Sequence, residues 1–382
     1  MLLRADTVLT GNQLLRPGWI EITDGAIHQV GTGAPPAPPD MDLGAATVIP
    51  GFVDTHLHGG GGANFSAAEP EQTATAAALH RSHGSTTLVA SLVTAAPADL
   101  LRQVAALARD VRAGVIDGIH LEGPWLSPLR CGAHQPALMR DPEPAEIEAV
   151  LGAADGAIRM VTIAPERAGA IAAIERLTSA GVVVAVGHTE ATYDQTRAAI
   201  DAGATVGTHL FNAMRPIDRR GPGPIVALME DPRVTVELIT DGVHIDPAIY
   251  RFVTKAVGVQ RISLITDAMA ATGMSDGRYL LGPLAVDVAA GVARVAGTDT
   301  IAGSTATMDW VLQFAVTHSG APRDEALQAA VAQASVIPAR ALGLPSAELA
   351  AGSGADLVVL DDDLAVIGVL RKGSWVVEPV LP

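Results

Sequence analysis

The middle of the chain alternates between short apolar runs and Ala-rich stretches whose apolar positions recur at helical spacing. The runs predict eight strands, at residues 52–58, 86–92, 115–122, 158–164, 182–188, 205–209, 234–241 and 261–267. The stretches between them predict helices, for example at 97–112, 168–180, 191–202 and 247–256. Continuous apolar strands are typical of a parallel sheet that is buried on both faces. The pattern therefore predicts an α/β protein with a (β/α)8 TIM barrel, although periodicity alone also allows an open doubly wound sheet.

Strand-like segments of a different kind lie at the two ends of the chain. They occupy residues 2–10, 19–23 and 26–30 at one end and 355–360, 366–371 and 375–377 at the other, separated by Gly-containing turn signals. We therefore expect an accessory β-sandwich domain built from residues 1–50 and 346–382, with the barrel formed by 51–345. A hairpin insertion is expected at about 272–302, after the last barrel strand.

Polar residues with metal-binding side chains fall at the carboxyl ends of five predicted strands. They are His56, His58, Glu122, His188, His209 and Asp267. In a closed barrel these strand ends meet at one mouth, so the six side chains would become neighbours. A single strand-end histidine is more often a structural residue. The shared position on five strands is what chance does not explain, and it favours the barrel over the open sheet.

These side chains predict a metal centre and a reaction for it. Nitrogen and carboxylate ligands without thiolates favour zinc, with iron, cobalt or manganese as alternatives, and one or two ions per chain. A bound divalent ion acidifies water and polarises a carbonyl, which suits hydrolysis of an amide or ester. Asp267, which ends the last strand, is the candidate general acid and base.

Other residues near the strand ends are candidate substrate contacts. Asn212 and Ala213 follow His209, and Arg220 follows Arg219 beside a Gly/Pro loop where guanidinium groups suit phosphate oxygens. A solvated arginine pair is an equally good explanation of the latter without the neighbouring motif. His244 follows the seventh strand, and His134 lies on the loop after Glu122.

Composition and charge exclude several classes of partner. The chain has 382 residues, of which 49% are hydrophobic and 17% charged, and its net charge is -16. This charge argues against nucleic acid and anionic membranes as partners, because both require clustered cations. No apolar run reaches the roughly 18 residues of a membrane helix. One cysteine and no recognisable signal segment predict a cytoplasmic protein.

Seven segments together resemble a known family. They are PGFVDTHLHG (50–59), HLEGPWL (120–126), VGHT (186–189), THLFNAM (208–214), DGVH (241–244), LITDA (264–268) and AGS (302–304). The chain resembles the amidohydrolase superfamily and, more closely, the N-acetylglucosamine-6-phosphate deacetylase family, over nearly its whole length. One departure is Cys131, where relatives commonly have a basic residue. Since the chain has only Lys255 and Lys372, Glu122 rather than a modified lysine would have to bridge two metals.

The resemblance implies a reaction, a ligand set and a partner subunit. It implies that a phosphorylated amino sugar loses its N-acetyl group, with Asp267 as the acid and base. It also implies two metal sites, one on Glu122, His188 and His209 and a second on His56 and His58 that shares Glu122 and Asp267. For the substrate, it implies that Asn212, Ala213 and Arg220 bind the phosphate and that His134 and His244 contact the acetyl group or the hydroxyls.

The resemblance also implies a homodimer in which Arg220 reaches the partner subunit's site. Two rival hypotheses stay open. One is the same reaction on N-acetylgalactosamine 6-phosphate, and the other is a noncatalytic phosphosugar-binding protein.

Overall fold

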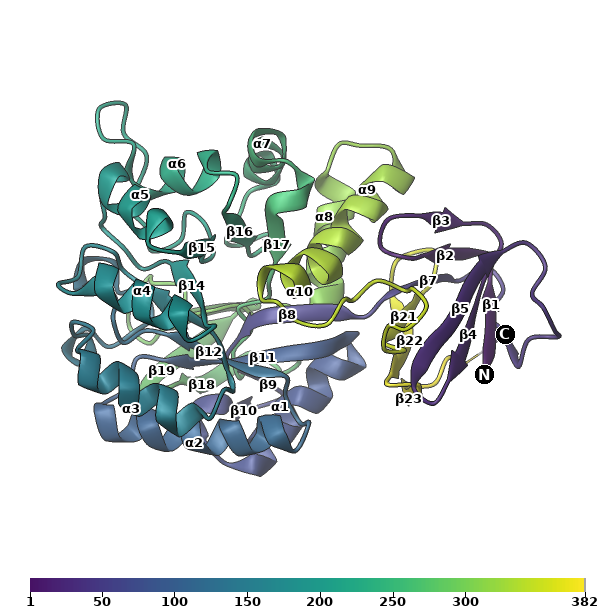
Figure 1. The fold of residues 1–382 in the computed structure, drawn as a ribbon, viewed down its shortest axis with the longest axis horizontal. Coiled ribbons are helices and arrows are strands. Elements are labelled where there is room, and N and C mark those ends of the chain that lie inside the picture. The colour runs from purple at the N-terminus through teal and green to yellow at the C-terminus, as the bar shows by residue number, and fades with distance from the viewer. Residues whose placement is uncertain (381–382) are drawn as a thin grey trace.

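Two bodies, a barrel and a smaller β unit, make up the computed structural model, which describes residues 1–380 (Figure 1). Eight parallel strands form one sheet in the order β17-β16-β15-β14-β13-β12-β11-β8. Their bounds are β8 Phe52–Leu57, β11 Ser85–Val93, β12 Gly118–Glu122, β13 Ile158–Ile163, β14 Val183–Val186, β15 Ala204–Gly207, β16 Thr235–Leu238 and β17 Ile262–Leu264. The predicted (β/α)8 barrel is confirmed.

The barrel closes where the last strand returns to the first. Beyond the end of β17, the Asp267 N–H donates to the His56 carbonyl at 2.8 Å, and the His58 N–H donates to the Ala268 carbonyl at 2.7 Å. Asp54 strengthens this seam, because its carboxylate accepts a hydrogen bond from the Thr266 hydroxyl at 2.6 Å. The seam therefore joins the segments that carry His56, His58 and Asp267.

Helices cover the outside of the barrel, and most follow the strand that precedes them in the chain (Figure 1). Proline stands in the first turn of several, where its missing N–H costs no helical hydrogen bond. The helices are α1 Pro70–Ser82, α2 Pro97–Arg112, α3 Pro144–Ala154, α4 Ala170–Ser179, α5 Tyr193–Asp201, α6 Gly223–Glu230, α7 Pro247–Val257, α8 Met308–His318, α9 Arg323–Val331 and α10 Ile337–Ala341. No helix within residues 1–380 is long and apolar enough to span a bilayer.

The barrel interior changes character from one end to the other. Side chains alternate along a strand, so every second residue faces inward. An apolar layer is formed by Val89, Met160, Ala185 and Val206, closed by Leu342. Two residues further along β11, β12, β13 and the segment after β15, a buried polar layer holds Ser91, His120, Thr162 and Thr208. Two residues beyond His120, β12 ends at Glu122, and the His120 ring also lies against His56, so the polar layer supports this part of the strand-end cluster from below.

Both chain ends build the smaller β unit, as predicted. Its sheets have the orders β5-β4-β1-β6 and β23-β22-β21-β7-β2-β3. The strands are β1 Leu2–Ala5, β2 Thr7–Leu9, β3 Leu14–Leu15, β4 Gly18–Thr23, β5 Ala26–Thr32, β6 Met41–Asp42, β7 Thr47–Pro50, β21 Leu357–Leu360, β22 Val366–Arg371 and β23 Ser374–Val377. Apolar residues from both ends of the chain, including Leu3, Ile20, Val48 and Leu357, share one core.

The segment 272–302 contains three antiparallel strands where we expected a hairpin. They are β18 Gly277–Leu281, β19 Leu284–Ala289 and β20 Val292–Val295. A turn at Gly282-Pro283 separates β18 from β19. Leu281, Val286 and Val288 from this sheet pack on Met269 and Val93, beside the barrel mouth. The insertion therefore forms one wall above the strand ends.

Candidate active site at the barrel mouth

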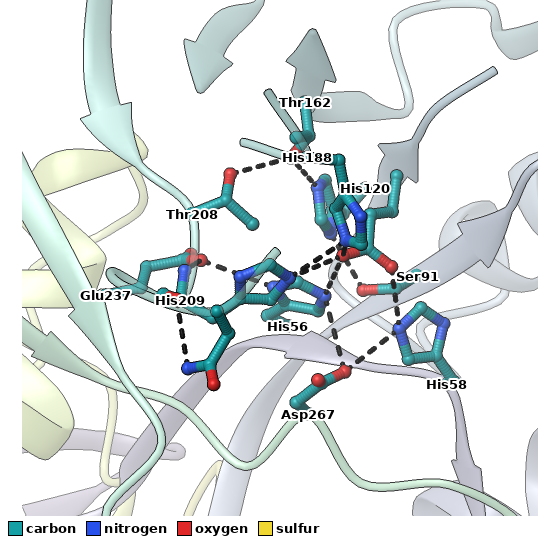
Figure 2. A network of polar contacts seen from close by, with 12 residues as sticks. His56, His58, Ser91, His120, Thr162, His188, Thr208, His209, Glu237 and Asp267 are labelled. Atoms are coloured by element: carbon teal, nitrogen blue, oxygen red, sulfur yellow. Dashed lines mark hydrogen bonds and ion pairs between the residues drawn. The ribbon is translucent and has the colours of Figure 1, made fainter. Parts of the chain in front are cut away.

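The strand-end residues turn into the barrel mouth through unusual backbone geometry. His188, His209 and Asp267 have positive φ values of 46°, 26° and 50°. Residues other than glycine seldom adopt this left-handed conformation, and where it persists the surrounding structure enforces it. Here it follows the end of a strand each time, so the chain turns sharply and the side chain points inward. Figure 2 shows these side chains gathered with His56 and His58.

Glu122 lies at the centre of the cluster. Its Oε1 is 3.0 Å from the Nε2 atoms of both His188 and His209, and these two nitrogens are 3.1 Å apart. Ligands about 2.0–2.1 Å from a tetrahedral ion lie roughly 3.3 Å from one another. The three atoms therefore have the mutual spacing of ligands to one cation, and all three residues are buried.

His56 and His58 form a second set on the other side of Glu122. The Nε2 atom of His58 lies 3.2 Å from Glu122 Oε2 and 3.1 Å from Asp267 Oδ1. The Nε2 atom of His56 lies 3.4 Å from Glu122 Oε1 and 3.5 Å from Asp267 Oδ1. It is buried and has no hydrogen-bonding partner within residues 1–380. Such an orphaned nitrogen between two carboxylates suits a divalent cation, so the residues present fit the predicted metal centre.

The electrostatics of the cluster follow from burying acids and imidazoles together. Burial opposes a charge on His58, but the nearby Asp267 and Glu122 outweigh this effect and raise its pKa to about 9. Burial likewise disfavours ionisation of Asp267, yet His56 and His58 lower its pKa to about 2. For Glu122, His56, His134 and His188 together overcome burial and hold the pKa well below its usual range. Both acids are therefore carboxylates at neutral pH.

His134 also contacts Glu122 but differs from the other histidines. Its Nδ1 accepts a hydrogen bond from the Thr94 N–H at 3.2 Å, so in the neutral ring the proton is on Nε2. This Nε2–H faces Glu122 Oε2 at 3.1 Å. Burial lowers the pKa of His134 to about 4. His134 therefore presents an uncharged donor to the site, which suits contact with a carbonyl oxygen better than metal ligation.

A cavity of about 430 Å³ opens above the cluster, within the range of small-molecule sites. Of the predicted residues, it is lined by His58, Glu122, His134, His188, His209, Asn212, Ala213, His244 and Asp267. The ring of His244 is held by Asp241, whose Oδ2 accepts from Nδ1 at 2.8 Å, so Nε2 is free for a ligand. The Ala213 N–H has no acceptor within residues 1–380. The cavity thus combines the cluster with uncommitted donors.

Arg220 is the predicted substrate contact that does not line this cavity. It lies on the exposed loop between β15 and α6. Arg130 is the one arginine or lysine among the cavity's lining within residues 1–380, and its Nε already donates to Glu190. Within one chain, the cavity therefore offers no uncommitted arginine or lysine among the described residues for a phosphate.

The structure adds supporting residues that the sequence analysis did not single out. Glu237 in β16 is buried, and its Oε2 accepts from His56 Nδ1 at 3.2 Å (Figure 2). His120 lies against His56 with ring centroids 4.5 Å apart and is held by Ser91 and Thr162. In the sequence, Glu237 is conspicuous because it is a charged residue inside an apolar strand. Its contact with His56 cannot be predicted from the sequence.

The family follows from comparison of the whole chain. The profile of the amidohydrolase family matches residues 47–376. The chain belongs to the amidohydrolase family. N-acetylglucosamine-6-phosphate deacetylase of Bos taurus is 35% identical to this amidohydrolase over 400 residues, covering 100% of this chain and 94% of the relative. N-acetylgalactosamine-6-phosphate deacetylase of Escherichia coli O157:H7 is 36% identical over 382 residues, covering 97% and 98%.

Solved structures give the same result for the amidohydrolase fold. The N-acetyl-D-glucosamine-6-phosphate deacetylase D267A mutant of Mycobacterium smegmatis, in complex with N-acetyl-D-glucosamine-6-phosphate, is 75% identical and has a TM-score of 0.98, covering 99% of both chains. N-acetylglucosamine-6-phosphate deacetylase of Thermotoga maritima is 29% identical with a TM-score of 0.88, covering 98% of this chain and 99% of its own. The predicted family is therefore confirmed.

Proposed function

We propose that this amidohydrolase hydrolyses the N-acetyl group of N-acetylglucosamine 6-phosphate, giving glucosamine 6-phosphate and acetate. The observation that carries the proposal is the convergence of Glu122, His188 and His209 with Asp267 beneath one cavity. The names of the relatives support the substrate, and the M. smegmatis complex supports a phosphorylated amino sugar as the ligand of this fold. Turnover distinguishes this function from the rival noncatalytic phosphosugar-binding protein.

A divalent metal fits the cluster, and zinc is our choice because the donors are imidazole and carboxylate. Glu122, His188 and His209 would hold one ion, and His56 and His58 a second that shares Glu122 and Asp267. When bound, the metal supplies Lewis acidity for the acetyl carbonyl and lowers the pKa of water. The chain's residues then position the amide and move the protons.

Asp267 has the position and charge for the proton transfers. As a carboxylate, it takes a proton from the attacking water while the water oxygen bonds to the acetyl carbon. The carbon–nitrogen bond then breaks, and the same proton goes to the sugar nitrogen, which leaves as an amine. His134, with its proton on Nε2, is the proposed donor to the acetyl oxygen, and His244 the proposed contact for a sugar hydroxyl.

We assign the phosphate to Asn212, the Ala213 N–H and Arg220 of the partner subunit. Support comes from the uncommitted Ala213 N–H and from the scarcity of arginine and lysine in the cavity of a single chain. Arg220 is exposed and therefore available to a neighbouring subunit. The proposed enzyme is accordingly a homodimer, and its single cysteine fits the reducing cytoplasm.

The experiment that tests the function is acetate release from the two epimeric sugar phosphates. We expect rapid release from N-acetylglucosamine 6-phosphate and loss of release after treatment with a chelator. The E. coli relative makes N-acetylgalactosamine 6-phosphate the second candidate substrate, and a larger kcat/KM for that epimer would reverse our choice. Binding without release of acetate from either compound would support the noncatalytic alternative.

A further inference from the structure

Glu237 is a buried acid for which the proposed reaction has no direct use. Its side chain points into the barrel from β16, and Glu122 is the only other buried glutamate within residues 1–380. No arginine or lysine in that part of the chain forms an ion pair with it. Burying a carboxylate is costly unless hydrogen bonds and charges compensate it. The groups that do so should therefore explain why an acid lies here.

All three hydrogen-bonding partners of the Glu237 carboxylate belong to segments that carry site residues. Oε2 accepts from His56 Nδ1 at 3.2 Å and from the His209 backbone N–H at 3.4 Å. Oε1 accepts from the Thr55 hydroxyl at 3.5 Å. One carboxylate thus connects β8 with the end of β15, two segments that are far apart in sequence. Each supplies a histidine to a different half of the cluster.

These contacts determine which nitrogen of His56 can bind a cation. When a cation takes the place of a proton on the ring, a carboxylate acceptor keeps the remaining proton on Nδ1, so Nε2 is the nitrogen that offers its lone pair. That Nε2 is the buried orphan between Glu122 Oε1 and Asp267 Oδ1. The other histidine of the pair, His58, has no partner on its Nδ1 within the described residues. His56 is therefore the histidine of this pair whose ring is oriented by a partner on Nδ1.

We propose that Glu237 is a positioning residue that orients His56 as a ligand for the second divalent ion. The proposal rests on the proposed metal centre and explains how one ligand of the second ion is held in place. A carboxylate that orients a ligating histidine typically changes metal affinity by roughly 10- to 100-fold. Because Glu237 fixes the side chain of His56 but only the backbone of His209, its loss should weaken the second position more than the Glu122–His188–His209 position.

The test is a titration of metal-free protein with Zn²⁺, monitored by calorimetry. A second titration uses Co²⁺ and is monitored by the visible absorption of the bound ion. Wild type should bind two ions, and Glu237→Ala should weaken the second by roughly 10- to 100-fold while nearly sparing the first. Glu237→Gln keeps an acceptor for His56 Nδ1, so it should lose less affinity for the second ion than Glu237→Ala. Ser263→Ala is the matched control, because Ser263 pairs with Glu237 across the sheet, is buried and has no partner within residues 1–380; it should bind both ions normally.

A double-mutant cycle with His56→Ala separates positioning from a general effect on the fold. If Glu237 acts through His56, then Glu237→Ala should weaken Zn²⁺ binding no further once His56 is absent. Equal weakening of both ions, or a full effect in the His56→Ala background, would overturn the proposal. So would a wild-type protein that binds a single ion. Acetate release by wild type tests the proposed function separately from these outcomes.

A measurement on wild type keeps the proposal testable if the variants do not fold. Nitrogen NMR of histidine-labelled protein reports which ring nitrogen carries the proton. With Zn²⁺ bound, we expect the His56 proton on Nδ1 and the metal on Nε2. A proton on Nε2 would overturn the assignment, whatever the behaviour of the variants.

Discussion

Replacement of Asp267 by asparagine is the most direct probe of the proposed chemistry. Asparagine has nearly the same shape, so the side chain can stay beside His58 and His56, which lie 3.1 and 3.5 Å from Asp267 Oδ1. It cannot accept a proton at neutral pH, whereas Asp267 is ionised there because its pKa is lowered to about 2. The substitution therefore removes the base while changing little else in the packing.

The expected decrease in kcat follows from the role of Asp267 as both general base and general acid. Loss of a general acid or base costs about 10²–10⁴ in rate. Because Asp267 serves both the attack and the departure of the amine, no other group replaces it in either step. We expect kcat to fall by at least roughly 10³, or about 4 kcal/mol of barrier. Affinity for the sugar phosphate should change less than about tenfold, since most of the proposed binding contacts lie elsewhere.

The assay combines acetate release with calorimetric binding of N-acetylglucosamine 6-phosphate and metal analysis of each variant. Asp299→Asn is the matched control, because Asp299 lines the same cavity but, within residues 1–380, forms no ion pair with the histidines of the cluster. It should keep wild-type kcat. The reasoning is refuted if Asp267→Asn retains kcat within tenfold of wild type at normal metal content, or if Asp299→Asn loses as much.

Three further predictions concern phosphate, metal and acid stability. Arg220→Ala should raise KM for N-acetylglucosamine 6-phosphate at least about tenfold more than for N-acetylglucosamine; equal effects would remove Arg220 from the phosphate site. Removal of metal by a chelator should abolish turnover but leave the barrel folded, and Zn²⁺ should restore activity, as followed by acetate release and circular dichroism. Hydrogen bonds from Arg233 outweigh burial and lower the pKa of Asp231, so its contribution to stability exists above the unfolded pKa of about 4 and is lost in acid. Asp231→Asn should therefore cost roughly 1–3 kcal/mol of unfolding free energy at pH 7 and less at pH 3, measured with urea.

The strand ends illustrate what could be predicted from the amino-acid sequence. A parallel strand buried on both faces requires an apolar run, so a histidine or acid that ends such a run is conspicuous. The barrel brings all these ends to one mouth whatever the lengths of the intervening helices. For this reason the cluster around Glu122, and the fold that assembles it, followed from local pattern.

The sequence by itself therefore determined the barrel, the β unit made by the two chain ends, and which strand ends carry the acids and histidines. Only the tertiary structure decided that Glu237 contacts His56, that Thr94 keeps the proton of His134 on Nε2, and that Arg220 lies away from the cavity of its own chain. These relations join segments far apart in sequence. They depend on sheet register, on backbone turns at the strand ends and on distances of a few tenths of an ångström, which a pattern of apolar and polar residues does not encode.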